Sequence, residues 1–102
     1  TDPEMLLLDE PSASLDLGAR ERLLQMLSGF AQSPSSPAMI MVTHHVEEIP
    51  PGFTHVLLMR DGKAQASGPI ESTLTAENLA ATFDMTFELS SENGRYAAIA
   101  RS

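Results

Sequence analysis

The sequence predicts an α/β fold that contains part of a parallel sheet, followed by β-hairpins and a helix. Two apolar runs, at residues 5–8 and 39–42, flank one amphipathic segment, and both runs end at polar side chains. Unbroken hydrophobicity is typical of strands that are buried on both faces of a parallel sheet. A strand, a helix and a strand within about 40 residues form a βαβ unit, whose crossover we expect to be right-handed.

The helix of this unit is predicted over residues 17–32. Asp16 can serve as its N-cap, and apolar side chains then repeat on one face at helical spacing. These side chains are Leu23, Leu24, Leu27 and Phe30, a stripe that indicates a core-facing surface. A loop rich in serine and proline, residues 33–37, ends the helix.

After the second strand, residues 46–49 have room for one helical turn before Pro50 and Pro51. A third strand is predicted at residues 56–60. Asp61-Gly62 is a strong hairpin signal and leads into a strand at residues 63–67.

The last third of the chain predicts a helix and one more hairpin. The helix covers residues 75–83, with Thr75 as its cap and with Leu79 and Phe83 facing inward. The final hairpin pairs residues 86–89 with residues 95–99 around Asn93-Gly94.

Length and composition limit the class of protein. The chain has 102 residues and no cysteine, which suits one small domain or a piece of a larger one. Without cysteine there is no disulfide framework or thiolate metal site, and a reducing compartment fits. The formal charge of -8 argues against non-specific nucleic-acid binding.

The N-terminus has neither a basic, apolar leader nor an initiator methionine. The chain begins Thr1-Asp2-Pro3-Glu4 and enters an apolar strand almost at once. We therefore expect this start to be a cut or processed end rather than a natural domain start. No apolar run approaches the roughly 20 residues that span a bilayer.

Asp9 and Glu10 stand together at the end of the first strand. Adjacent carboxylates repel each other, so their placement is costly unless something binds them. A magnesium ion and a reactive water would remove this cost, because one carboxylate can hold the metal and its neighbour can orient the water. The alternative is an exposed acidic turn. His44 follows the second strand, and ligands of such sheets sit beyond the carboxyl ends of the strands.

The run Leu6-Leu7-Leu8-Asp9-Glu10-Pro11-Ser12-Ala13-Ser14-Leu15-Asp16 resembles the Walker B and D-loop motifs of ABC ATPases. Val42-Thr43-His44 similarly resembles the H-loop of this family, and the order, spacing and strand placement agree. The resemblance covers residues 3–70 well and the remainder loosely. It implies part of the parallel sheet of a P-loop NTPase.

The resemblance implies a role for each matching residue. Asp9 would bind Mg²⁺, through water, and Glu10 would be the catalytic base or would position the hydrolytic water. His44 would contact the γ-phosphate of ATP and the attacking water. Asp16 and Ser14 would belong to the D-loop, which meets a second cassette when two cassettes enclose two ATP molecules.

Several of these side chains also have a simpler interpretation. Asp16 caps a helix whether or not it has a second role, and His45 is interpreted as a solvated residue. Glu47 and Glu48 are interpreted as a solvated face. The leucine stripe is interpreted as core rather than as a partner surface.

Important family motifs are absent from this sequence. It contains no Gly-x-x-x-x-Gly-Lys-Ser/Thr loop, so the amides and lysine that cradle the β- and γ-phosphates are missing. The glutamine loop and the Leu-Ser-Gly-Gly-Gln signature are absent too. Leu27-Ser28-Gly29 does not replace the signature, because it follows the Asp-Glu pair and lies in a helix. His45 stands where an acidic residue is frequent, and Leu17 where a proline is frequent.

Residues 1–102 are therefore expected to be a C-terminal fragment of one ABC ATPase domain. Residues 1–70 would run from the Walker B strand to the hairpin after the H-loop, and residues 71–102 would form the C-terminal helix and hairpin. The fragment alone is expected to be inactive, with apolar sheet surface exposed where strands are missing. The run from Thr43 to His55 looks most like a bacterial subgroup related to molybdate-type ATPases.

The resemblance also implies partners and a location. The expected partners are the N-terminal half of the same domain, a second cassette in a head-to-tail dimer and a transmembrane permease. The expected location is the cytoplasm, at the inner face of the membrane. Two other interpretations remain open: a non-enzymatic α/β interaction or regulatory module, and an ABC ATPase that does not serve transport.

Overall fold

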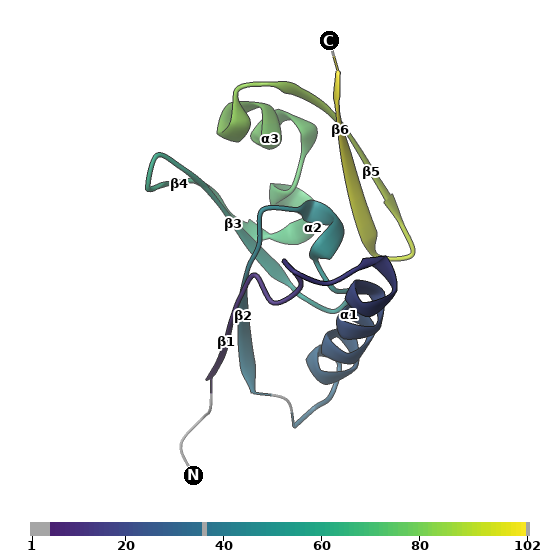
Figure 1. Cartoon of the computed structure of the whole chain (residues 1–102). Helices are drawn as coiled ribbons and strands as arrows, with labels where there is room; N and C mark the ends of the chain where they lie inside the picture. The colour runs from purple at the N-terminus through teal and green to yellow at the C-terminus, as the bar shows by residue number, and fades with distance from the viewer. Residues whose placement is uncertain (1–4, 36, 102) are drawn as a thin grey trace.

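The computed structural model of this protein describes residues 5–35 and 37–101. Within these ranges the strands form three separate two-stranded sheets, one parallel and two antiparallel. Figure 1 shows the parallel pair and one long helix near the N-terminal end, and the hairpins and short helices toward the C-terminal end. Thr1 to Glu4, which the sequence interpretation took as a cut end, lie outside the described residues.

The predicted βαβ unit is confirmed. Strand β1 (Met5–Asp9) is followed by helix α1 (Leu17–Ala31) and strand β2 (Ala38–Val42). The two strands are parallel and in register from Met5 opposite Ala38 to Asp9 opposite Val42. Both strands therefore end at the same edge, where the predicted catalytic residues follow.

The two strands are not buried on both faces in this chain, so that prediction is wrong, whereas the predicted exposure of apolar sheet surface is confirmed. Met5 is 65% exposed, Leu7 61% and Ile40 48%, whereas Leu8, Met39 and Met41 are half-buried. Because side chains alternate along a strand, one face is partly covered and the other is open. No third strand within the described residues pairs with β1 or β2, which explains the open face.

Helix α1 begins at the predicted cap, since the Oδ1 atom of Asp16 accepts a hydrogen bond of 2.8 Å from the amide of Ala19. Leu24 and Leu27 are buried as expected. Phe30 is 52% exposed, so its predicted inward position is wrong.

The first hairpin is confirmed and longer than predicted. Strands β3 (His55–Arg60) and β4 (Lys63–Pro69) are antiparallel, with a register shift after Leu58. Asp61 and Gly62 have φ angles of 53° and 75°. Two consecutive positive φ angles are typical of the type I′ turn that matches strand twist, which is why Asp-Gly predicted the turn.

Two helices follow the first hairpin. Helix α2 (Ile70–Thr73) was not predicted, whereas helix α3 (Ala76–Phe83) starts at the predicted cap, where the Oγ1 atom of Thr75 accepts from the amide of Asn78 at 3.1 Å. Leu79 is buried, but Phe83 is half-exposed, so its predicted inward position is wrong. The Phe83 ring instead packs edge-on against Phe87, with ring centroids 6.1 Å apart.

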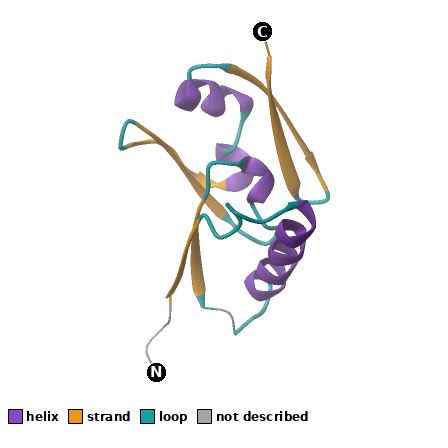
Figure 2. Ribbon diagram, viewed as in Figure 1, coloured by secondary structure: helices purple, strands orange, loops and turns teal. Residues whose placement is uncertain are grey.

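Strands β5 (Thr86–Glu92) and β6 (Arg95–Arg101) form the predicted final hairpin. Its tip is Asn93-Gly94, with positive φ at both residues. In Figure 2 this hairpin runs past the short helices, and its tip lies beside the start of α1.

The core lies in the C-terminal part of the chain. Its buried residues are Leu58, Ile70, Leu74 and Leu79. Side chains from β3, β5, β6 and the 3₁₀ helix η1 (Val46–Glu48) pack around them. The single turn of η1 was predicted at residues 46–49. Residues from before and after position 70 contribute to this core. The division of the chain into residues 1–70 and 71–102 stays a prediction.

Candidate active site

The loops that follow β1 and β2 carry the candidate active site. The amide of Glu10 donates a 2.8 Å hydrogen bond to the carbonyl of Val42, so the two strands stay paired up to the point where both loops begin. His44 lies two residues beyond Val42. The parallel register thus brings together two loops that lie more than 30 residues apart in the sequence.

Glu10 has a left-handed backbone conformation, with φ of 48°. The other described non-glycine residues with positive φ are Asp61, Asp84 and Asn93. Aspartate and asparagine tolerate this conformation because their short polar side chains bond locally, whereas a longer side chain such as glutamate is less suited to it. Backbone strain of this kind is concentrated at functional sites.

The side chains of Glu10 and His44 meet. The Oε1 atom of Glu10 lies 3.3 Å from the Nε2 atom of His44. The His44 side chain is 75% exposed and that of Glu10 is 39% exposed, so both can reach a bound molecule. A carboxylate and an imidazole at this separation contact each other directly, and both can bind one water molecule that lies beside them.

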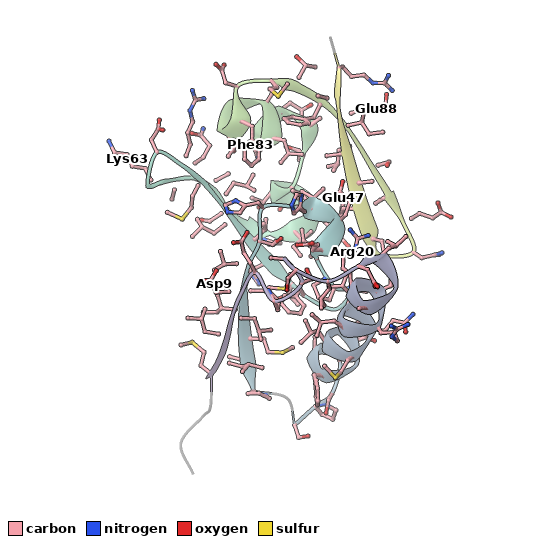
Figure 3. All side chains as sticks on the ribbon, viewed as in Figure 1. Asp9, Arg20, Glu47, Lys63, Phe83 and Glu88 are labelled. Atoms are coloured by element: carbon pink, nitrogen blue, oxygen red, sulfur yellow. The ribbon has the colours of Figure 1, made fainter. Side chains whose placement is uncertain are left out.

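Asp9, which directly precedes Glu10, is exposed at the end of β1, where Figure 3 labels it. Among the described residues, no group of three or more histidine and acidic side chains could hold a metal ion. Mg²⁺, however, is commonly held by one or two carboxylates, waters and the phosphates of its substrate. Asp9 can therefore supply one ligand to a magnesium–nucleotide complex, in which water and phosphate oxygens would supply most of the other ligands.

The loop from Glu10 to Asp16 is a run of tight turns. The amide of Ala13 donates to the carbonyl of Glu10 at 3.2 Å, and the amide of Leu15 donates to that of Ser12 at 3.1 Å. Ser12 is buried, whereas Ser14 and Asp16 are exposed. The helix-cap role of Asp16 is confirmed, and Ser14 lies on the exposed side of the same loop.

The loop after β2 is braced by a contact that the sequence did not predict. The Oγ1 atom of Thr43 donates to the Oε1 atom of Glu48 at 2.7 Å and also accepts from the amide of His45 at 3.1 Å. Glu48 is only 7% exposed. The interpretation of Glu47 and Glu48 as a solvated face is therefore wrong, because η1 turns Glu48 inward against Thr43.

A second unpredicted contact joins α1 to the final hairpin. The guanidinium of Arg95 donates from Nη1 and Nη2 to the two carboxylate oxygens of Glu21, at 2.6 and 3.0 Å. These hydrogen bonds lower the pKa of Glu21 to about 2, and Arg20 contributes in the same direction. The pKa of Arg95 is raised by the same contact. The two residues are 74 positions apart, and no local pattern could have indicated the pair.

Two grooves on the described part of the chain are lined by other residues. The larger, of about 500 Å³, lies between Leu74 and the β5–β6 hairpin and is lined by Tyr96 and Glu71 among others. The smaller, of about 220 Å³, lies between Ala31, Met39 and Phe53. The candidate active site lies in neither groove. It is at an open edge of the β1–β2 sheet, as expected for a site that other parts of the domain complete.

No protein-family model matches the chain, but curated proteins do. It is 46% identical over 83 residues to an ABC transporter ATP-binding protein of Bacillus subtilis, covering 81% of this chain and 31% of that protein. It is 38% identical over 97 residues to one of Lactococcus lactis, covering 95% of this chain and 38% of that protein. Among solved structures, an ABC transporter in an inward-facing conformation matches with a TM-score of 0.75 and 25% identity, over 96% of this chain and 40% of that one.

The chain is therefore part of an ABC-type ATP-binding cassette, and the α/β fold predicted from the sequence is confirmed. It is also similar to the molybdenum import ATP-binding protein of a Shewanella strain, with 39% identity over 79 residues, which are 78% of this chain and 22% of that protein. The chain spans less than two fifths of the length of each of these relatives. None of the helices in the described ranges is long and apolar enough to cross a membrane.

Proposed function

We propose that the intact protein containing this chain hydrolyses ATP and that its turnover drives transport across a membrane. The observation that supports this proposal best is the 3.3 Å approach of Glu10 and His44 at the edge where two parallel strands end. The names of the relatives, ABC transporter ATP-binding proteins, agree with it.

In this proposal the exposed carboxylate of Glu10 orients the attacking water and accepts its proton. His44, which lies directly beside Glu10, contacts the same water and the γ-phosphate, where negative charge develops. Asp9 would help to hold Mg²⁺, commonly through water, and the bound ion would supply positive charge against the phosphates. The 3.3 Å separation of the pair leaves Glu10 and His44 close enough to act on one water.

The phosphate cradle belongs to the rest of the domain, because this sequence contains no Gly-x-x-x-x-Gly-Lys-Ser/Thr loop. Ser14 and Asp16, exposed on the loop before α1, face a second cassette in a head-to-tail dimer.

A transmembrane permease is the partner that couples turnover to transport, and binding to this permease would hold the protein in the cytoplasm at the inner face of the membrane. The charge of -8 argues against a nucleic-acid partner. The likeness to molybdenum import proteins supports a related subgroup.

Substitution of Glu10 in the intact protein tests the proposal. Glu10→Gln keeps the size of the side chain but removes the base, so we expect ATP turnover to fall by about 10² or more while ATP binding is retained. His44→Gln is expected to lower turnover by about 10²–10³. His45→Gln is the matched control, because the neighbouring His45 side chain is exposed and has no role in the proposal. Unchanged turnover in Glu10→Gln would overturn the assignment.

The chain alone is expected neither to bind magnesium–ATP tightly nor to hydrolyse it, since it lacks the phosphate loop. Calorimetry on the 102-residue chain measures this directly. Binding at micromolar concentrations would contradict the expectation and would favour a nucleotide site formed by this part of the domain.

A further inference from the structure

Arg95, at the start of β6, contacts the two segments that follow the candidate catalytic loops, α1 and η1. One contact is the paired hydrogen bond to Glu21 of α1. The other is a 2.6 Å hydrogen bond from Nη2 to the backbone carbonyl of Glu47 in η1. The three residues come from segments that are far apart in the sequence. In Figure 3, Glu47 is labelled beside β6, and Arg20, the neighbour of Glu21, is labelled near the start of α1.

The contact to Glu21 anchors the first turns of α1. The loop with Ser14 and Asp16 leads directly into this helix, and Asp16 is tied to it by the hydrogen bond from the amide of Ala19. Tight turns then connect this loop back to Glu10. A displacement of the start of α1 would therefore be transmitted through a short, hydrogen-bonded segment to the Glu10 backbone.

The contact to Glu47 anchors the segment after His44. Glu47 is held a second time, because its Oε2 atom accepts from the amide of Ala98 in β6 at 3.1 Å. Glu48, the next residue, holds Thr43 and so fixes the residue before His44. The same hairpin thus contacts the segments that follow both loops, in addition to the β1–β2 pairing that joins the starts of the loops.

The guanidinium is well suited to this task. The side chain of Arg95 is 29% exposed, and its Nε atom is buried without a hydrogen-bond partner within the described chain. Such burial is tolerated because the other two nitrogens are paired with a carboxylate and a carbonyl. An arginine presents several donors in a fixed plane, whereas a lysine is a single flexible point charge and cannot reproduce both contacts in the same geometry.

We propose that Arg95 is a positioning residue for ATP hydrolysis, which holds α1 and η1 against the β5–β6 hairpin and so keeps Glu10 and His44 at working distance. This inference rests on the proposed function. It assigns to the C-terminal hairpin an indirect part in catalysis. In this inference Arg95 does not contact the nucleotide and acts only through the two loops.

The test uses the intact protein and compares Arg95→Met, Arg95→Lys and Arg101→Met. Arg95→Met is expected to lower kcat for ATP by roughly ten- to a hundredfold, because small displacements of catalytic groups cost about that much. KM for ATP should change by less than about twofold, since Arg95 does not touch the nucleotide. Arg95→Lys should recover part of the lost kcat. Arg101→Met is the matched control, because it removes the exposed ion pair with Glu88 from the same hairpin.

A lower melting temperature in Arg95→Met with unchanged kcat per folded protein would overturn the inference and leave Arg95 with a role in stability alone. A parallel rise in KM with no change in kcat would overturn it too. If Arg95→Met does not fold, Arg95→Lys and Glu21→Gln decide, because each keeps part of the network. A lower kcat at unchanged KM in either variant supports the inference, and wild-type kcat in both overturns it.

Glu10→Gln, measured beside these variants, separates the two proposals. If Glu10→Gln is inactive and the Arg95 variants turn over normally, the proposed function stands and only the role of Arg95 fails. If Glu10→Gln turns over normally, the proposed catalytic site itself is wrong.

Discussion

The β1–α1–β2 unit and the C-terminal half of the chain differ in how they are held together. The C-terminal half surrounds a cluster of buried side chains that includes Leu74 and Leu79, whereas the βαβ unit buries Leu24 and Leu27 on its helix but not its strands. The strands of the βαβ unit leave Leu7 and Ile40 about half exposed or more. Burial of apolar surface is the dominant stabilising contribution in folding. The candidate catalytic groups therefore lie on the region of the chain that has the smaller core of its own.

The largest expected difference between the two regions is the cost of removing an apolar side chain. Leu79→Ala should lower the free energy of unfolding of the chain by about 2–5 kcal/mol, because it leaves a cavity in the core. Ile40→Ala, on the open face of β2, should cost less than about 1 kcal/mol, because Ile40 is already 48% exposed. Urea denaturation of both variants gives the two values. Equal costs would show that the βαβ unit is as well packed as the C-terminal core.

Helix caps offer a smaller and more local comparison. Asp16→Ala and Thr75→Ala should each cost about 1 kcal/mol, because each leaves a helix amide without its acceptor. Loss of the Thr75 cap should lower the stability of the whole core through α3, whereas loss of the Asp16 cap should increase amide exchange mainly in α1. Hydrogen exchange followed by residue separates these outcomes, and Asp16→Asn, which keeps a cap oxygen, is the control. Uniform loss of protection in Asp16→Ala would mean that the regions unfold together.

The smallest expected effect concerns the ion pair that joins the two regions. The pKa of Glu21 is lowered from 4.5 to about 2, chiefly by its hydrogen bonds to Arg95. A carboxylate with a lowered pKa stabilises the folded state above its unfolded pKa, and this contribution is lost as the pH falls from about 4.5 to 2. Because the side chain is 35% exposed, solvent screening makes the contribution modest.

Melting temperatures of the chain between pH 5 and pH 2 measure this contribution. In Glu21→Gln the fall in melting temperature over this range should be shallower than in the wild type. Glu88→Gln, which removes an exposed charge from the final hairpin, controls for the change in net charge. An identical pH dependence in wild type and Glu21→Gln would contradict a structural role for the pair in solution.

The elements with local signals were predictable from the sequence. The Asp61-Gly62 and Asn93-Gly94 turns, the caps of α1 and α3 and the βαβ order all follow from a few adjacent residues. The approach of Glu10 to His44 was predictable because the carboxyl ends of neighbouring parallel strands share one edge, whereas the catalytic roles of the site residues stay predictions.

Burial and long-range pairing were not predictable in the same way. A helical stripe indicates which side chains can be buried, but not whether the chain supplies a surface to cover each of them, as Phe30 shows. The exposure of Ile40 was expected, because apolar sheet surface was predicted to be open where strands are missing. The Glu21–Arg95 pair depends on how the last hairpin packs against η1 and α1. Glu48 was misjudged because its burial follows from a single turn of 3₁₀ helix that places it under Thr43.

The left-handed backbone of Glu10 has a consequence for how this cassette can evolve. A glycine at position 10 would relieve backbone strain of roughly 1–2 kcal/mol, but it would also remove the carboxylate beside His44. Stability and activity thus favour different residues at one position. In the proposed function the carboxylate is needed for hydrolysis, so glutamate at position 10 would be favoured by activity and disfavoured by stability.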